Sequence, residues 1–257
     1  MPDLRLQFQH HDEEVPAPAP ILAEPDALDM LCTAEFVAEK LVPWGTNYTF
    51  AVGLTDRDGV DHFAVYKPQA GERPLWDFPR GTLYRREYAS YLLSRWLGWN
   101  IVPPTVLREG PHGIGSVQLY IEPDPDSEDD HRFWGRRAPE MERMVMFDFI
   151  ANNADRKIGH CLLDRSGRTW GIDHGLTFNV EPKLRTVLWQ YCGEPISGAI
   201  ARDLKRFLEL GAPLLAELGD ILDRQEVREI GHRVENILAA GRYPILDPHR
   251  NVPYGWW

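Results

Sequence analysis

Apolar residues recur at helical spacing in three parts of the chain. The first part, 82–97, is followed by Gly98, a residue type that commonly ends helices. The second, 138–152, has Pro139 in its first turn, where proline is favoured. The third, about 200–240, has an amphipathic pattern that also predicts helix. The expected core positions are, in chain order, Tyr84, Tyr88, Tyr91, Leu92, Met141, Met144, Val145, Phe149, Leu204, Leu208, Leu214, Leu215, Leu218, Leu222, Val234 and Leu238.

Alternating apolar residues predict an antiparallel hairpin near the N-terminus. Its strands cover 48–53 and 62–67, and its turn contains Asp58-Gly59, a strong hairpin signal. A further strand is expected at 116–122. It leads into the acidic, proline-containing stretch 123–130, which we take as a boundary between two lobes.

A second hairpin is predicted near the middle of the chain. Short apolar runs flank the turn-rich interval 164–168. If Leu163 pairs with Trp170, His160 lies opposite Asp173, and opposed residues in an antiparallel pair have β-carbons about 5 Å apart. We therefore expect these two side chains to stand together and to be able to share one cation.

The length of the chain, 257 residues, suits two lobes of about 100 to 150 residues, each with its own core. We expect a mobile tail at 1–25, which holds a His-His pair and a Pro-Ala alternation, an N-lobe at 26–122 and a C-lobe at 123–257. The formal net charge of −11 argues against a nucleic-acid binder and against broad adhesion to an anionic membrane.

The three cysteines are scattered, and their odd number offers no disulfide framework. The N-terminus lacks a basic segment followed by an apolar run, and no stretch approaches the 18 or more apolar residues of a membrane span. We expect a soluble cytoplasmic protein that is not exported and is not stably inserted in a membrane.

The segment after the second helix carries the most informative chemistry. Asp155 follows the helix by one short loop, where it would face the cation held at His160 and Asp173, or an acceptor hydroxyl. Phosphoryl transfer needs such a grouping of carboxylate and metal ligands. Taken alone, each motif also fits a helix C-cap or a strand end. Asp148 falls on the buried face of the helix, so we expect it to brace the loop and not to do chemistry.

The N-terminal half offers candidates for binding phosphates. Lys67 ends a predicted strand, and Glu87 borders the inward stripe of the first helix. A strand lysine paired with a helix glutamate is how kinase-type enzymes fix an ammonium against nucleotide phosphates. Gly45, Thr46 and Asn47 form a short loop that could present backbone N–H groups to phosphates, although an ordinary turn would look the same.

Four motifs together carry a family resemblance. They are Val65-Tyr66-Lys67-Pro68, Gly115-Ser116-Val117-Gln118-Leu119-Tyr120, Asn153-Ala154-Asp155-Arg156 and Ile172-Asp173-His174-Gly175-Leu176. In this order the chain resembles the phosphatidylinositol 3-/4-kinase superfamily, closest to the type II phosphatidylinositol 4-kinases, and more narrowly an actinobacterial kinase-like family. The resemblance spans about 44–178. It implies an α+β, bilobal protein-kinase-like fold with an antiparallel sheet and one helix in a small N-lobe, and a mainly helical C-lobe.

The resemblance also implies roles for particular residues in an ATP- and metal-dependent kinase. The implied nucleotide contacts are Lys67 with Glu87 as its partner, the loop residues Gly45, Thr46 and Asn47, and the strand residues Gln118, Tyr120 and Ile121. Asp155 would orient and deprotonate the acceptor hydroxyl, and Asp173 would hold the metal. For Arg156 two roles stay open, stabilising the transferred phosphoryl group or forming a structural salt bridge.

One position departs from the family pattern. Kinases of this type usually have asparagine as the second metal ligand, five residues after the catalytic aspartate, and here His160 stands there. Imidazole suits manganese or zinc better than magnesium, which prefers oxygen ligands. The change is compatible with manganese in place of magnesium, with one weakly held metal, or with a pseudokinase.

The leading hypothesis is therefore a kinase that transfers the γ-phosphoryl group of ATP to a hydroxyl acceptor. The alternatives are a protein AMP-transferase that binds ATP in reverse and an inactive nucleotide-binding scaffold. A metallohydrolase built on His160, Asp173 and His174 has little support, because adjacent strand residues point to opposite faces. The acceptor is open among lipid, small molecule and protein; Lys183 and Arg185 are the only cations between His174 and Pro195.

Overall fold

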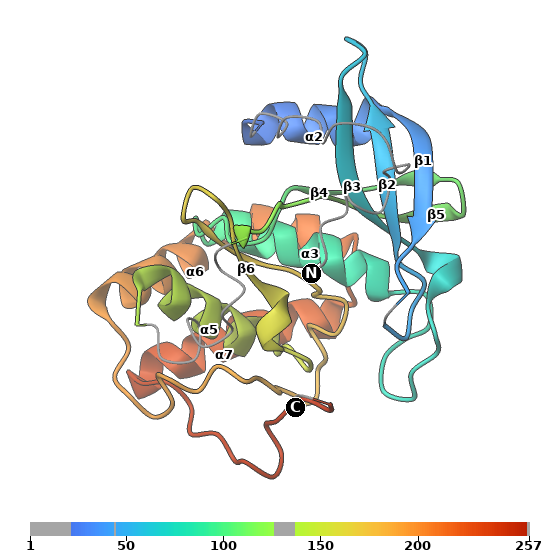
Figure 1. The fold of residues 1–257 in the computed structure, drawn as a ribbon. Coiled ribbons are helices and arrows are strands. Elements are labelled where there is room, and N and C mark those ends of the chain that lie inside the picture. The colour runs from blue at the N-terminus through green and yellow to red at the C-terminus, as the bar shows by residue number, and fades with distance from the viewer. Residues whose placement is uncertain (1–21, 44, 126–136, 256–257) are drawn as a thin grey trace. The chain divides into compact units, whose positions relative to one another are not determined.

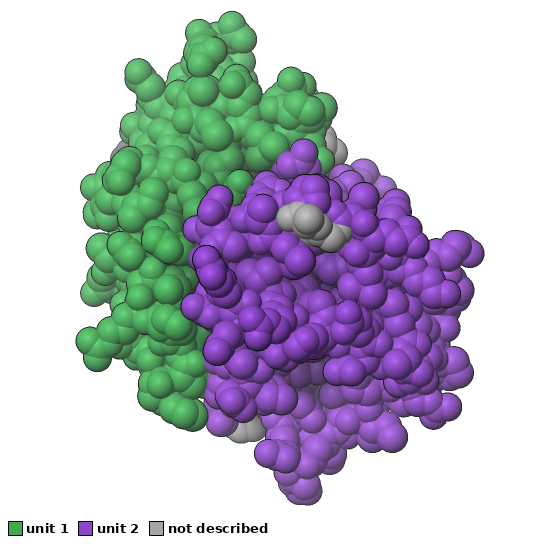
Figure 2. All heavy atoms as spheres, turned by 180° about the vertical axis from the view of Figure 1, so that it is seen from behind, with its two compact units in different colours: residues 1–88, 103–123 green, residues 89–102, 124–257 purple. Residues whose placement is uncertain are grey.

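The computed structural model describes residues 22–43, 45–125 and 137–255. The chain divides into two compact units, 1–88 with 103–123 and 89–102 with 124–257, coloured separately in Figure 2. Most of the predicted N-terminal tail lies outside the described residues. The last two positions of that segment belong to helix α2 (Glu24–Thr33), which has a proline in its first turn.

Unit 1 contains a five-stranded sheet in the order β1-β2-β3-β5-β4, antiparallel throughout (Figure 1). Its strands are β1 (Glu35–Leu41), β2 (Phe50–Thr55), β3 (Asp61–Pro68), β4 (Thr105–Gly110) and β5 (Gly113–Leu119). The predicted β2–β3 hairpin is confirmed. At its turn the carboxylate of Asp56 accepts hydrogen bonds from the N–H groups of Asp58 and Val60, and Gly59 supplies a φ of 77°.

The core of unit 1 lies between α2 and the sheet. One buried cluster contains Met30 and Leu31 of the helix, Ala34 directly after it, and side chains of β2, β3, β4 and β5. Helix α2 and strands β1 and β4 were not predicted from the sequence. Strand β1 is exposed over most of its length and so lacks the alternation that marks a half-buried strand.

Helix α3 (Leu83–Trp96) forms where the apolar stripe predicted it, and the boundary between the units falls within it. Gly98 ends the helix in the left-handed region, with a φ of 71°. The end of α3 is fixed inside unit 2, where the indole N–H groups of Trp96 and Trp99 donate to Glu217 and Asp203, each at 2.8 Å.

Unit 2 is mainly helical, with α5 (Pro139–Ala151), α6 (Gly198–Gly219) and α7 (Arg224–Ala240). The amphipathic region predicted at 200–240 is thus two helices. Asp223 starts the second through a reciprocal capping box with Glu226. Leu215 was expected in the core but is 43% exposed.

Within the described residues, the remaining elements of regular structure are short. They are the 3-10 helices η1 (Gln69–Gly71) and η3 (Ile158–His160), and the hairpin strands β6 (Cys161–Leu163) and β7 (Thr169–Gly171). Across the ranges that the structure describes, no helix combines the length and apolar character needed to cross a membrane.

Candidate active site

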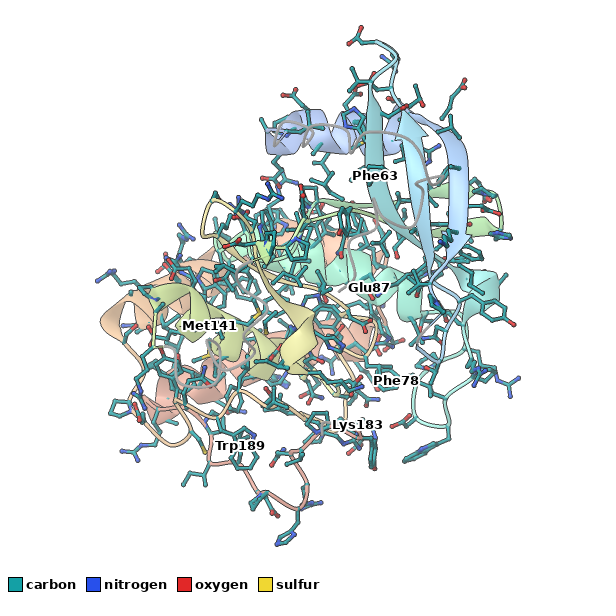
Figure 3. All side chains as sticks on the ribbon, in the orientation of Figure 1. Phe63, Phe78, Glu87, Met141, Lys183 and Trp189 are labelled. Atoms are coloured by element: carbon teal, nitrogen blue, oxygen red, sulfur yellow. The ribbon has the colours of Figure 1, made fainter. Side chains whose placement is uncertain are left out.

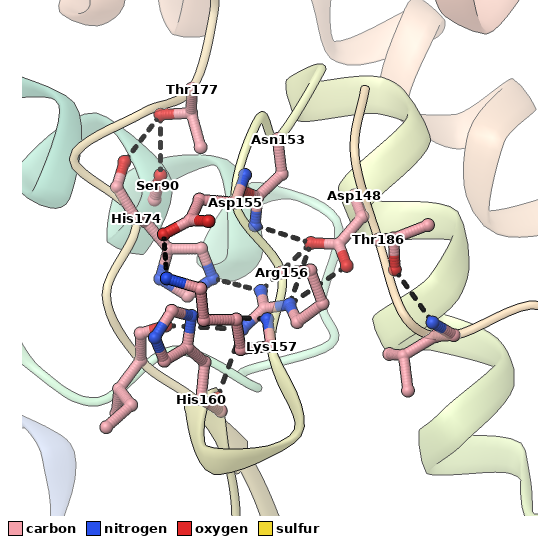
Figure 4. A network of polar contacts seen from close by, with 12 residues as sticks. Ser90, Asp148, Asn153, Asp155, Arg156, Lys157, His160, His174, Thr177 and Thr186 are labelled. Atoms are coloured by element: carbon pink, nitrogen blue, oxygen red, sulfur yellow. Dashed lines mark hydrogen bonds and ion pairs between the residues drawn. The ribbon is translucent and has the colours of Figure 1, made fainter. Parts of the chain in front are cut away.

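The loop after α5 holds Asp155 in a fixed backbone position (Figure 4). Asn152 ends the helix in the left-handed region with a φ of 52°, and its N–H bonds back to the last helical turn. The side-chain amide of Asn153 donates to Asp148 at 2.9 Å, while its oxygen accepts the N–H of Asp155 at 3.0 Å. The expectation that Asp148 braces this loop is confirmed.

Arg156 ties the loop to the hairpin from a fully buried position. Its guanidinium forms an ion pair with the buried Asp148 at 2.9 Å. It also donates to the carbonyl oxygens of His160 and Ile172, at 3.0 and 3.2 Å, and to the imidazole of His174 at 2.7 Å. Of the two roles left open for Arg156, this geometry favours the structural salt bridge.

Asp155 itself is partly enclosed, with its side chain 24% exposed and its carboxylate 2.9 Å from the ammonium of Lys157. Burial raises the pKa of Asp155 above its ordinary value, and the charge of Asp173 raises this pKa further. The cations Lys157 and Arg185 oppose the shift. A carboxylate with a raised pKa is better suited to take a proton from a hydroxyl.

The hairpin brings His160 and Asp173 together, although in a different register from the predicted one. Imidazole Nε2 lies 3.4 Å from the Asp173 carboxylate. Leu163 pairs with Thr169 and not with Trp170, so that the N–H of Ile172 bonds to the His160 carbonyl. The predicted pairing was wrong by one residue.

The turn explains the register. Asp164 bonds to Arg168 across a loop of three residues, and Gly167 supplies the left-handed conformation with a φ of 83°. Asp173 follows the last strand with a φ of 60°, also left-handed. Since such a conformation changes the chain direction after β7, Asp173 approaches His160 without being its strand partner.

The residues fit a metal that arrives with a nucleotide. No cluster of three or more His, Cys, Asp or Glu side chains within the described ranges could hold a metal by itself. Nucleotide-bound magnesium is held by one or two carboxylates plus phosphate oxygens. The half-exposed Asp173 carboxylate therefore suffices as a protein ligand.

His160 fits a metal less directly. Its Nδ1 accepts the N–H of Lys157 at 3.4 Å, which places the proton of the neutral ring on Nε2. The protonated Nε2 then faces the Asp173 carboxylate at 3.4 Å and is not a metal ligand in this tautomer. The geometry favours His160 as the group that orients Asp173.

Lys67 and Glu87 form an ion pair within unit 1, from β3 to α3. Glu87, labelled in Figure 3, is buried. The N-terminus of α3 is anchored by Glu72, whose carboxylate accepts the N–H of Tyr84 at 2.9 Å. Burial raises the pKa of Glu72. The pair suggested by the sequence is thus present in the structure.

The other predicted nucleotide contacts lie in unit 1 with partners of their own. In the loop, Gly45 and Thr46 are exposed, and the side chain of Asn47 accepts the N–H of Arg73 at 2.8 Å. Gln118 is buried and donates to Thr105 at 2.9 Å.

The strand end after Gln118 was also expected to meet a nucleotide. The N–H of Tyr120 already bonds to the Phe63 carbonyl at 3.1 Å, and Ile121 is half-buried. The role of these residues in nucleotide binding stays a prediction.

Two cations near Asp155 were not among the predicted site residues. Lys157 had a local signal, because it stands two residues after Asp155. Arg185 had none, because its approach to the loop that holds Asp155 depends on tertiary pairing between segments about 30 residues apart.

No family model matches the chain. Protein Rv2133c of Mycobacterium tuberculosis (strain ATCC 25618 / H37Rv) is 38% identical, and the alignment covers 74% of this chain and 81% of that protein. The chain belongs to the Rv2133c family. This relationship extends over most of both proteins.

Solved structures identify the fold of this Rv2133c-family chain. The Golgi casein kinase with Mn and ADP bound has a TM-score of 0.54 at 15% identity, covering 84% of this chain and 75% of that one. Hydra Fam20 with sugar has a TM-score of 0.55 at 15% identity, covering 83% and 86%. The predicted kinase-like α+β fold is confirmed.

Proposed function

We propose that the protein is an ATP-dependent kinase that transfers the γ-phosphoryl group of ATP to a hydroxyl acceptor. The observation that carries the proposal is the environment of Asp155. The backbone N–H of Asp155 is held by the side chain of Asn153. Burial raises the pKa of the Asp155 carboxyl, and the nearby charge of Asp173 raises it further. A base beside a metal-binding carboxylate, on a kinase-like fold, is the arrangement that phosphoryl transfer requires.

In the proposed reaction Asp155 orients the acceptor hydroxyl and takes its proton. The hydroxyl oxygen forms a bond to the γ-phosphorus while the bond from that phosphorus to the bridging oxygen of ADP breaks. ADP leaves with the electron pair. Lys157, 2.9 Å from Asp155, holds this carboxylate in place and limits the rise of its pKa.

Phosphate binding is assigned to residues of unit 1. We propose that Lys67 contacts the α- and β-phosphates and that Glu87 keeps its ammonium in position. Gly45, Thr46 and Asn47 would cover the phosphates. The strand residues Gln118, Tyr120 and Ile121 would meet the base.

Asp173 is proposed to hold the divalent metal, which would neutralise charge on the phosphate oxygens. The Golgi casein kinase was solved with Mn and ADP, which supports manganese as well as magnesium as a candidate. His160→Asn would restore the residue usual in such kinases. We expect this variant to bind ATP better with magnesium relative to manganese than the wild type does, because the amide oxygen suits the harder ion.

The proposal of a lipid kinase in place of a protein kinase rests on the sequence motifs. Their resemblance to phosphatidylinositol 3-/4-kinases supports a lipid acceptor, whereas the structural neighbours include a casein kinase. Transfer of label from γ-labelled ATP would support a kinase of either type. Label appearing on the product only from α-labelled ATP would identify an AMP-transferase instead.

Calorimetric titration with ATP, in magnesium or in manganese, tests the proposal first. Wild-type protein is expected to bind ATP with a metal, and Asp173→Ala is expected to lose the metal-dependent part. Asp58→Ala, in the exposed β2–β3 turn, is a matched control that should bind as the wild type does. Folded wild-type protein that binds no ATP with either metal would overturn the proposal.

A further inference from the structure

The segment around Arg185 runs directly beside the catalytic loop, within unit 2. The N–H of Arg185 donates to the carbonyl of Asn153 at 2.9 Å, and the carbonyl of Arg185 accepts the N–H of Arg156 at 3.0 Å. Arg156 and Thr186 form a parallel bridge. The backbone of Arg185 is therefore fixed on both sides of Asp155.

The C-terminal segment binds the other edge of this segment (Figure 1, red). The carbonyl of Asn251 accepts the N–H of Thr186 at 2.9 Å, and its side chain donates to Leu184 at 2.6 Å. Nearby, the guanidinium of Arg185 lies over the ring of Tyr254, 4.8 Å from its centroid. Tyr254 is 78% exposed, so this contact holds the arginine at the surface and not in the core.

Among the residues that the structure describes, Arg185 has no ion-pair partner. No carboxylate of the described residues lies within salt-bridge distance of its guanidinium, and Lys157 already pairs with Asp155. Arg185 is still close enough to lower the pKa of Asp155. In a chain with a net charge of −11, this leaves a surplus cation beside the proposed base.

A second arginine of unit 2 provides a contrast. Arg137 also lies over a tyrosine ring, 5.3 Å from the centroid of Tyr191. The two terminal nitrogens of the Arg137 guanidinium, however, donate to both carboxylate oxygens of Glu194, at 2.7 and 2.6 Å. Both arginines therefore stack on a tyrosine. Of the two, only Arg185 has a guanidinium that is available to bind an external anion.

We propose that Arg185 binds an anionic group of the acceptor and that Tyr254 positions it. The acceptor would then be a hydroxyl compound that also carries a phosphate or carboxylate group. An arginine fork binds either group in a bidentate manner, which would hold the acceptor with its hydroxyl beside Asp155. This inference rests on the proposed function, since it assigns the substrate class of the same site.

Binding of inorganic phosphate to the full-length protein tests the site without knowledge of the acceptor. The probe is the side-chain Nε–H signal of Arg185 in NMR spectra, assigned by its loss in Arg185→Gln. We expect a saturable shift of this signal with phosphate. Tyr254→Ala should weaken phosphate binding about 2- to 5-fold, the factor expected for an exposed cation–π contact. Arg137→Gln, the matched control, should leave the Arg185 shift unchanged.

The source of the anion is decided by two further titrations. Glycerol 3-phosphate represents a soluble acceptor, and vesicles of phosphatidylinositol represent a lipid headgroup, with phosphatidylcholine vesicles as the neutral control. A shift of the Arg185 signal with glycerol 3-phosphate supports the inference and indicates a soluble acceptor. Co-sedimentation with phosphatidylinositol vesicles that is lost in Arg185→Gln supports it and indicates a lipid headgroup. The absence of any saturable change at Arg185 with phosphate and both probes would overturn it.

Failure of this inference is distinguishable from failure of the proposed function. ATP binding in calorimetry, without phosphate binding at Arg185, would overturn the anionic acceptor alone. Phosphate binding at Arg185 in a protein that binds no ATP would overturn the kinase and leave Arg185 as an anion site.

Discussion

Among single residues, Asp155 has surroundings that favour chemistry over stability. Burial raises its pKa in the folded protein above the ordinary value of 3.8, so the folded state binds this proton more tightly than the unfolded state. The free energy of unfolding therefore falls as the pH rises from about the unfolded pKa through the folded pKa. Above both values the charged carboxylate destabilises the fold.

We expect Asp155→Asn to be inactive and more stable. Loss of a general base typically lowers the rate by about 10²- to 10⁴-fold. At pH 7 the variant should unfold at higher urea concentration than the wild type, and this gain should vanish below about pH 3.8, where the carboxyl is neutral in both states. Urea titrations at both pH values measure the difference. A variant that is less stable at pH 7 would contradict the assigned pKa shift.

The buried pair of Arg156 and Asp148 makes the opposite contribution. Removing one partner of a fully buried ion pair leaves a charge without compensation, which costs about 3–5 kcal/mol. We expect Arg156→Met and Asp148→Asn each to lower the free energy of unfolding by such an amount. In the double variant the loss should be smaller than the sum of the two single losses, because no unpaired charge remains.

Urea denaturation of the four proteins in this cycle measures the coupling. Arg143→Met, on α5 but without a buried ion pair, is the control for removing an arginine. Additive losses in the cycle would show that Arg156 is not held by Asp148, and would revive a role for Arg156 in contacting the phosphoryl group.

At the residue scale, the sequence predicted the bracing role of a buried carboxylate but not its partners. The buried position of Asp148 on a helical face was enough to predict its bracing role, since a buried carboxylate needs a partner. The partners themselves were not predictable. The bond from Arg156 to His174 joins residues 18 apart through the hairpin, and no local pattern encodes such a contact.

At the scale of elements, the β6–β7 hairpin shows how a turn decides register. The apolar runs and the interval 164–168 between them were found from the sequence, but the pairing of the two strands was predicted one residue out of register. Asp164 closes the real turn, accepting hydrogen bonds from Ser166, Arg168 and the indole of Trp170. These bonds depend on Gly167 being left-handed, and the composition of the turn alone did not show which of its residues would close it.

Asp164→Ala is therefore expected to destabilise the hairpin. The indole N–H of Trp170 is buried and would lose its acceptor, which costs about 1–3 kcal/mol. Urea denaturation should show this loss, whereas the matched control Asp58→Ala, at the exposed β2–β3 turn, should change stability by no more than about 0.5 kcal/mol. Equal effects of the two variants would contradict the role given to Asp164.

The long helices were predictable because each carries both a periodic apolar face and a terminal signal. Helix α3 has Gly98 at its end, and α5 has Pro139 at its start. Helix α2 was not predicted, because it is short and follows a proline-rich stretch whose composition is typical of a mobile tail. The break between α6 and α7 is marked by the capping box at Asp223, a signal that is present in the sequence.

For the whole molecule, the order of motifs predicted the fold where single motifs did not. A lysine at a strand end, an aspartate after a helix and an aspartate after a hairpin are each ordinary features. In this order they matched a kinase-like arrangement, and the solved structures confirm that fold. The acceptor did not follow from the order of motifs, because contacts such as the one proposed for Arg185 depend on how distant segments pack.

Nucleotide binding should change the stability of the whole molecule. A ligand that binds only the native state raises the free energy of unfolding by about 2.7 kcal/mol at 100 times its dissociation constant. We therefore expect ATP with manganese or magnesium to raise the melting temperature of the wild type, with a smaller rise for ATP alone. Lys67→Met should reduce the rise, because the phosphates lose the ammonium that Glu87 positions.

Lys205→Met, on the exposed face of α6, is the matched control and should keep the full rise. Thermal unfolding monitored by tryptophan fluorescence measures all three proteins at several ATP concentrations. A rise that is equal in Lys67→Met and in the wild type would remove Lys67 from the phosphate site. If the ion pair of Lys67 with Glu87 has only a structural role, Lys67→Met should lower the melting temperature in the absence of ATP and leave the ATP-dependent rise unchanged.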